Sequence, residues 1–165
     1  MTAHKLIALL VGFLAPAVAQ AAAAQSQPTT AQASPVELVG DVRHDRIVIV
    51  DGQQKHELVE PKTVVPGDKL IFTTRYRNVG SAPVTNFVVT NTLPSAVSVT
   101  AESAAGLTVS VDGGKSWGTL ASLTLADGKG GRRAASPGDV THVRWIIPAI
   151  QPGANGALTY QAIVR

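Results

Sequence analysis

The sequence predicts an all-β protein, an antiparallel β-sandwich, from three observations. About eight short runs rich in β-branched residues recur at a spacing of roughly 10 residues. Gly, Pro, Asn and Asp cluster between these runs, where turns need them. Beyond the N-terminal region, no apolar stripe follows the 3.6-residue period of an amphipathic helix. A barrel fits the same pattern, but a sandwich is favoured because tightly curved barrels use many inward-facing glycines.

Residues 65–94 (VPGDKLIFTTRYRNVGSAPVTNFVVTNTLP) are the stretch around which the predicted fold is organised. They open with a Pro-Gly-Asp turn. The next residues alternate, with Phe72 and Tyr76 on one side and Arg75 and Arg77 on the other. This alternation is typical of a strand with one buried and one solvated face. An Asn-Val-Gly-Ser break then leads to a second β-branched run that ends at Leu-Pro.

The remaining strands are expected on both sides of this stretch. Asp51-Gly52 is a strong signal for a tight hairpin turn, and Gly40 is expected to weaken the middle of the first strand. Residues 126–139 (ADGKGGRRAASPGD) are expected to be a long basic loop. The predicted strands are residues 36–42, 46–50, 58–59, 96–101, 107–111, 120–125, 140–147 and 157–164.

The N-terminal residues 1–24 have the features of a cleaved signal peptide. A short basic segment precedes an apolar run at residues 6–14, which is too short for the roughly 20 residues of a membrane span. Small residues follow and offer cleavage before Gln20 or Gln25. We therefore expect an exported protein, in the periplasm, in the medium or on the cell surface, with no membrane span after cleavage.

The mature chain is expected to consist of a disordered leader and one domain. Residues 25–35 are polar, contain proline and lack periodicity. Residues 36–165 are long enough to bury a core. The chain has no cysteine, so packing and sheet hydrogen bonds must hold this exported domain together. Thiol catalysis and cysteine-ligated metals are excluded for the same reason.

The charge and aromatic content argue against nucleic-acid binding. The formal net charge is only +3, and one of the positive charges, Lys5, lies in the predicted signal peptide. Aromatic residues make up 4% of the chain. Nucleic-acid binding usually requires clustered basic residues with stacking aromatics.

Several motifs in order resemble the bacterial repeat family known as domain of unknown function eleven. They are the Pro-Gly-Asp turn, the Tyr76-Arg-Asn-Val-Gly segment, Ala82-Pro-Val-Thr-Asn, Thr92-Leu-Pro, Trp145-x-Ile and Gln151-Pro-Gly. The resemblance covers most of residues 41–165 and implies an immunoglobulin-like β-sandwich in exported or surface-displayed proteins. Asn91 stands where that family commonly has Asp, which weakens any inference of a cation-binding role there. The family implies no chemistry and no cofactor.

Ser110-x-Asp-x-Gly-x-Ser-Trp117 fits the Asp-box pattern of sialidase-like propellers. The Asp carboxylate can accept hydrogen bonds from turn N–H groups while Trp117 packs beneath the hairpin. One interpretation is a hairpin clasp, with Trp117 in the core. The other is a sugar contact through Trp117.

Two further groups of polar residues are candidates for ligand binding. Lys129, Arg132 and Arg133 could hold a phosphate or an acidic glycan, since glycine N–H groups form anion-binding nests. The alternative is a mobile loop with solvated charges. The pairs His44-Asp45 and His56-Glu57 could ligate zinc if their strands were adjacent, but nothing in the sequence supplies a third ligand.

The sequence contains none of the common catalytic motifs, so we expect no enzyme activity. The prediction is an exported structural or interaction module that contacts another envelope or surface protein, with pairing across an open sheet edge as the natural mode. The alternative is a glycan- or anion-binding module that uses residues 126–139 or Trp117.

Overall fold

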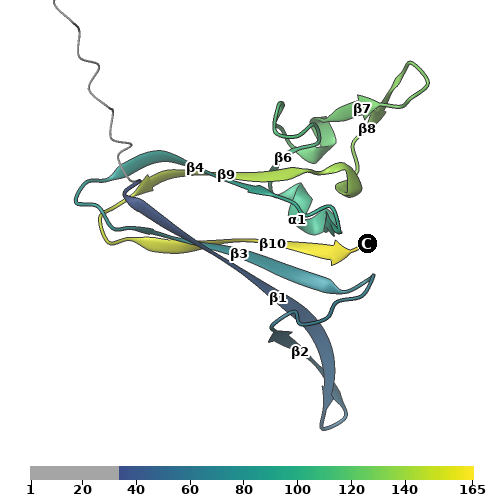
Figure 1. Cartoon of the computed structure of the whole chain (residues 1–165), viewed down its shortest axis with the longest axis horizontal. Helices are drawn as coiled ribbons and strands as arrows, with labels where there is room; N and C mark the ends of the chain where they lie inside the picture. Colours follow the sequence, from purple (N-terminus) through teal and green to yellow (C-terminus); the bar gives the residue numbers. More distant parts are fainter. Residues whose placement is uncertain (1–33) are drawn as a thin grey trace, which may run out of the picture. The chain divides into compact units, whose positions relative to one another are not determined.

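The computed structural model describes residues 34–165, and there it confirms the predicted all-β antiparallel sandwich (Figure 1). One sheet has the strand order β2-β1-β3-β10-β5, a second has the order β4-β9-β6, and β7 pairs with β8. The predicted signal peptide and residues 25–33 of the predicted leader lie outside the described residues. The strands are β1 Val36–Val50, β2 Gln53–Val59, β3 Lys69–Asn78, β4 Val84–Thr92, β5 Val97–Val99, β6 Thr108–Ser110, β7 Thr124–Ala126, β8 Arg132–Ala134, β9 His142–Ile150 and β10 Asn155–Val164.

The strand β1 is longer than the sequence predicts. The two runs at residues 36–42 and 46–50 form one continuous strand, because Gly40 stays paired with Thr74 of β3 and the residues between the runs are paired as well. The predicted Asp51-Gly52 hairpin is confirmed. Both turn residues have positive φ, 53° and 74°, as a tight two-residue hairpin turn requires.

The core lies between the two sheets and follows the predicted alternation. On β3, Leu70 is buried and Phe72 is partly buried, whereas Arg75 is exposed. The ring of Phe72 stacks on Tyr160 of β10 with centroids 4.8 Å apart, and burial raises the pKa of Tyr160 to about 12. The buried members of this core are mostly aliphatic side chains: Leu70, Leu93, Val97, Val99, Ala104, Val109, Val111, Val140, Val143 and Ala162, with Tyr160.

The two sheets are joined at one end by two neighbouring chain crossings, from β3 to β4 and from β9 to β10, and Asn78 holds them together. Asn78 is fully buried. Its side-chain amide donates to the carbonyl oxygens of Ala82 (2.9 Å) and Ile150 (2.8 Å), and its side-chain oxygen accepts from the N–H of Gly80 (2.9 Å). The Asn-x-Gly motif noted in the sequence is therefore a buried clamp between the two crossings.

The strand β9 continues past Pro148, where the sequence predicts a break. Pro148 lacks an N–H to donate, and the residue opposite it, Asn86 of β4, takes a left-handed conformation with φ of 51°. The strands pair on both sides of this position, from Val84↔Ile150 to Thr92↔His142. The local kink in β4 thus accommodates a proline inside a central strand.

Three short elements differ from the prediction. The segment after β5 turns into a short helix, α1 Ala101–Ala105, with Thr100 accepting from the N–H of Ser103 as its N-cap. The predicted strand at 120–125 is a 3₁₀ turn, η1 Leu120–Ser122, followed by β7, and a second such turn, η2 Pro137–Asp139, precedes β9. None of the helices in residues 34–165 combines the length and the apolar character needed to cross a membrane.

Candidate interaction surface

The hairpin of β1 and β2 extends beyond the sandwich (Figure 1). The strand β1 pairs with β3 through residues 36–45 and with β2 through residues 44–50. Beyond Asp45 the hairpin is thus a two-stranded ribbon. We call residues 44–59 the arm. The core and the partly buried side chains packed on it include Val42, just before the arm, but no residue of the arm itself.

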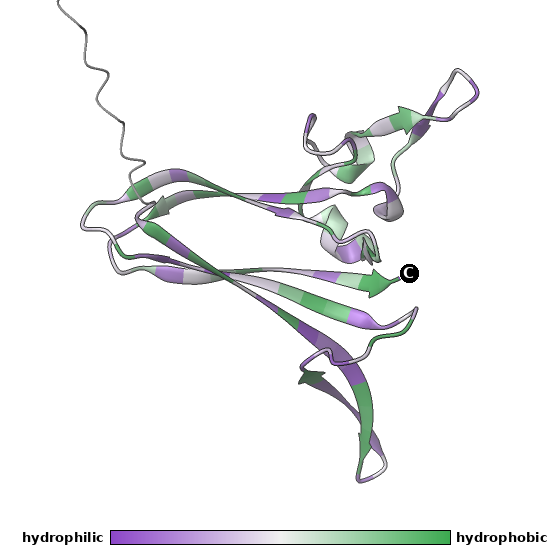
Figure 2. Ribbon diagram, in the orientation of Figure 1, coloured by the Kyte–Doolittle hydropathy of each residue, from purple (hydrophilic) through white to green (hydrophobic). Residues whose placement is uncertain are grey.

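One face of the arm, which we call the apolar face, exposes three large apolar side chains beside the polar Asp45, Gln54 and His56. Ile47 is 57% exposed, Ile49 is 65% exposed and Leu58 is 53% exposed. These three side chains lie on the same face, because Asp45 and Leu58, Ile47 and His56, and Ile49 and Gln54 are cross-strand partners. Figure 2 shows the hydrophobic outer part of β1. Exposed apolar side chains gathered on one regular element are typical of an interaction site.

Polar side-chain contacts on both faces, an ion pair on one and a hydrogen bond on the other, hold the two strands of the arm in register. On the face opposite to Ile47, the Arg46 guanidinium lies 2.6 Å from a carboxylate oxygen of Glu57. On the apolar face, His56 Nδ1 lies 2.7 Å from Asp45 Oδ1. Exposed pairs of this kind contribute little stability, about 0–1 kcal/mol each, but they favour one pairing of the strands.

The chain that leaves β2 covers one face at the base of the arm. Because β2 and β3 lie on opposite sides of β1, residues 60–68 must cross β1. Glu60, Lys62 and Thr63 line a shallow hollow together with His44 and Arg46, which share one face of β1. The crossing therefore runs over the face of His44, and the apolar face of Ile47 stays open.

The two His-acid pairs considered as possible metal ligands do not come together, although their strands are adjacent. His44 is opposite Val59 and His56 is opposite Ile47, so the two imidazoles lie on different faces. His56 is engaged by Asp45 and Glu57 by Arg46. Among residues 34–165, no group of three His, Cys, Asp or Glu side chains is arranged to hold a metal ion.

The Asp-box residues form a hydrogen-bonded hairpin clasp, but Trp117 is not in the buried core as that interpretation expects. The Asp112 carboxylate accepts from the N–H groups of Lys115 (3.0 Å) and Ser116 (2.9 Å) and from the Ser116 hydroxyl (2.5 Å). These bonds, with one from the Ser110 hydroxyl, hold the pKa of Asp112 well below its ordinary value. The Trp117 indole N–H donates to the carbonyl of Gly114 at 2.9 Å.

Trp117 lies on the outer surface of the second sheet and is not a member of the buried core. It is half-buried, and the Arg144 guanidinium of β9 lies 3.5 Å from the ring centroid. The His142 ring approaches edge-on, with centroids 6.1 Å apart. A cation–π contact therefore occupies one face of the indole, and a sugar could stack only on the other.

The segment 126–139 is not the structureless loop that the sequence predicts, because it contains β8, which pairs with β7 at the start of the segment. The Asp127 carboxylate accepts from the N–H groups of Lys129 and Gly131, each at 2.8 Å, and closes the turn. Arg133 makes a two-pronged ion pair with Asp139, at 2.7 and 2.6 Å. Glycines tolerate the positive φ that this turn needs at residues 128 and 130.

The three basic residues proposed as an anion site are not brought to one point. Arg132 and Arg133 are adjacent in β8 and face opposite sides of the hairpin. Arg132 donates to the hydroxyl and carbonyl oxygens of Thr124 (2.7 and 2.8 Å), and Arg133 is neutralised by Asp139. Lys129 lies at the turn between β7 and β8. Both guanidinium groups thus stabilise the hairpin.

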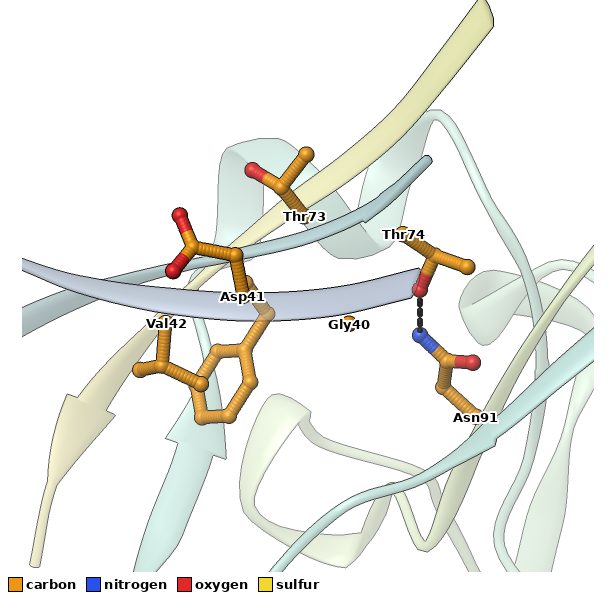
Figure 3. Close-up of a pocket in the computed structure, with 7 residues that line it drawn as sticks. Gly40, Asp41, Val42, Thr73, Thr74 and Asn91 are labelled. Carbon is orange, nitrogen blue, oxygen red and sulfur yellow. Dashed lines mark hydrogen bonds between the residues drawn. The ribbon is translucent and has the colours of Figure 1, made fainter. Parts of the chain in front are cut away.

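A shallow hollow opens between β1 and the second sheet (Figure 3). Asn91 of β4 crosses the interior and donates to the Thr74 hydroxyl at 2.8 Å, while Asp41 and Thr73 point to the other side of the sheet. A methyl group at Gly40 would meet no atom within 4 Å. The hollow marks where β1 diverges from the second sheet, and Asn91 serves there as a bridge between sheets.

The sequence predicts residues 46–50 as a strand but does not predict that they form a ribbon outside the sandwich. The run RIVIV at residues 46–50 places apolar side chains on both faces of the strand. A strand of a sandwich buries only one of its faces, so some of these side chains must stay exposed. No protein-family model, curated protein or solved structure matches this chain, so the resemblance to the domain of unknown function eleven family stays a prediction.

Proposed function

We propose that this protein is an exported, non-catalytic interaction module of the bacterial envelope or cell surface, and that it binds another protein through the apolar face of the arm. The observation that carries the proposal is the exposure of Ile47, Ile49 and Leu58 on one face of a regular ribbon. Burying such side chains against a partner removes apolar surface from water, which is the main favourable contribution to most protein–protein association. The signal-like N-terminus and the family resemblance support the location.

The shape of the arm suits this role. The sandwich body is a packed scaffold, and the arm carries its apolar side chains away from that scaffold. A partner can therefore approach them without disturbing the core. The alternative, a glycan- or anion-binding module at residues 126–139, has less support because Arg132 and Arg133 are already hydrogen-bonded within the hairpin.

The test compares two double variants of the exported protein. Ile47→Ser with Ile49→Ser removes apolar side chains from the arm. The matched control, Val88→Ser with Ile146→Ser, changes a cross-strand pair on the second sheet that is similarly exposed, at 48% and 60%. Co-purification from the envelope fraction of the encoding bacterium is expected to return one stoichiometric partner with the wild type and the control, and to lose it with the arm variant. Equal recovery of the partner with all three proteins would contradict the proposal.

The export part of the proposal is tested separately. Edman sequencing or intact-mass measurement of the mature protein is expected to place its N-terminus at Gln20 or Gln25. A mature protein that begins at the initiator methionine would contradict export through a cleaved signal peptide.

A further inference from the structure

The outer edge of β2 is the end of the five-stranded sheet. Within residues 34–165, the order β2-β1-β3-β10-β5 gives β2 one neighbour, β1. Residues 53–58 of β2 are all exposed. In a strand with one neighbour, alternate N–H and C=O groups point away from the sheet and can pair with another strand. This edge is distinct from the apolar face of the arm.

We infer that the strand seated on this edge is β2 of a second copy of the chain, antiparallel to the first and related to it by a two-fold axis at His56. The seven residues 53–59 overlap over their full length when His56 faces its counterpart. This register places Lys55 of each copy opposite Glu57 of the other. Full overlap of the strands and charge complementarity thus select the same pairing, and opposite charges on facing strands stabilise a sheet.

Neighbouring registers lose this match. Antiparallel pairing allows shifts of two residues, because only alternate residues of β2 point their N–H and C=O groups outward. One such shift places Lys55 opposite Lys55 of the other copy, and the opposite shift places Glu57 opposite Glu57, so both set like charges against each other. A lysine on an edge strand normally prevents pairing with unrelated strands, so Lys55 favours a strand that presents an acid at this position, and a second β2 does so.

Pairing at the edge would extend a charge row that already exists. Glu57 is bound by Arg46 of its own chain at 2.6 Å. Across the axis, Lys55 of the second copy would stand on its other side, which gives the order Arg46, Glu57, Lys55. On the opposite face the two copies would present Ile47, Ile49 and Leu58 together. The inference does not depend on the proposed function, since it uses the edge and leaves the apolar face open.

Single cysteines test the register, because the chain has no native cysteine. In His56→Cys the two sulfhydryl-bearing residues face each other across the axis. Their Cα atoms would be about 4.5–5.5 Å apart, within the range a disulfide spans. In the control, Gln54→Cys, the two cysteines would be more than about 13 Å apart along the strands. Mild oxidation of the full exported chain is expected to give a covalent dimer with His56→Cys and none with Gln54→Cys.

Charge reversal tests the complementarity. Lys55→Glu alone and Glu57→Lys alone each place like charges opposite each other twice, and self-association measured by sedimentation should weaken roughly tenfold or more. An equimolar mixture of the two variants restores two Lys–Glu pairs and is expected to associate like the wild type. Crosslinking of both cysteine variants to the same extent, of neither, or failure of the mixture to associate would overturn the inference. Loss of the envelope partner alone would leave it standing.

Discussion

Two hairpins leave the sandwich, and they use their side chains in opposite ways (Figures 1 and 2). In the β7–β8 hairpin, Arg133 forms an ion pair with Asp139, and Arg132 donates a hydrogen bond to Thr124. Leu123 and Leu125 pack on the core. The arm pairs its charges as well but leaves Ile47 and Ile49 in water. The comparison separates a hairpin that completes the fold from one whose apolar surface packs on nothing else in residues 34–165.

The sandwich body from which both hairpins project should show the largest effect of a single substitution. Asn78→Ala removes three hydrogen bonds from a fully buried side chain and leaves the carbonyls of Ala82 and Ile150 and the N–H of Gly80 without this partner. Each buried polar group left unsatisfied costs about 1–3 kcal/mol. The free energy of unfolding, measured by urea denaturation, should fall by about 3 kcal/mol or more.

The variant Asn78→Asp tests the contribution of the two amide donors. It keeps the acceptor for Gly80 but removes both donors and places a carboxylate beside two carbonyl oxygens. We expect a loss at least as large as that of Asn78→Ala. A loss below about 1 kcal/mol for both variants would show that the crossings do not depend on this clamp.

Asp139→Ala should have the next largest effect, because Asp139 is the residue that ties the β7–β8 hairpin to its base. Its carboxylate accepts from both terminal nitrogens of Arg133 and from the N–H and hydroxyl of Ser136. We expect a loss of about 2 kcal/mol, in line with charge-assisted hydrogen bonds on a partly exposed group. Hydrogen exchange should become faster in residues 132–139 and stay unchanged in the arm. Equally faster hydrogen exchange in both hairpins would contradict the different roles assigned to them.

These same residues show which features of the fold could be predicted from the sequence and which could not. Strand periodicity and the Asp51-Gly52 turn depend on neighbours along the chain, so the strands and the first hairpin could be predicted. The pairing of Arg133 with Asp139 and the clamp role of Asn78 depend on contacts that only the fold creates. Periodicity identifies residues 46–50 as strand, but whether another layer covers them depends on where β3 begins, which no local signal in β1 specifies.

Acid should loosen the neighbourhood of β7–β8. Hydrogen bonds from Ser116 lower the pKa of Asp112, those from the N–H groups of Lys129 and Gly131 lower that of Asp127, and Arg133 lowers that of Asp139. A carboxyl with a lowered folded-state pKa stabilises the fold fully above its ordinary pKa of 3.8, and this contribution is lost as the pH falls through the folded-state value.

The measurement is hydrogen exchange between pH 5 and pH 2, corrected for intrinsic rates, over residues 112–117 and 127–139. Protection is expected to fall with pH in both segments. Asp112→Asn should remove the pH dependence of the first segment and leave that of the second. A pH-independent profile in the wild type would contradict the role assigned to these carboxylates.

The smallest effect on stability is expected where the effect on binding is expected to be largest. Ile47→Ser with Ile49→Ser changes two side chains that are more than half exposed and contact no core residue. The remaining cost is the lower β-propensity of serine, so the free energy of unfolding should change by at most about 1 kcal/mol. A loss of 3 kcal/mol would mean that these isoleucines support the fold as Leu123 and Leu125 do, and the two hairpins would then differ in composition but not in role.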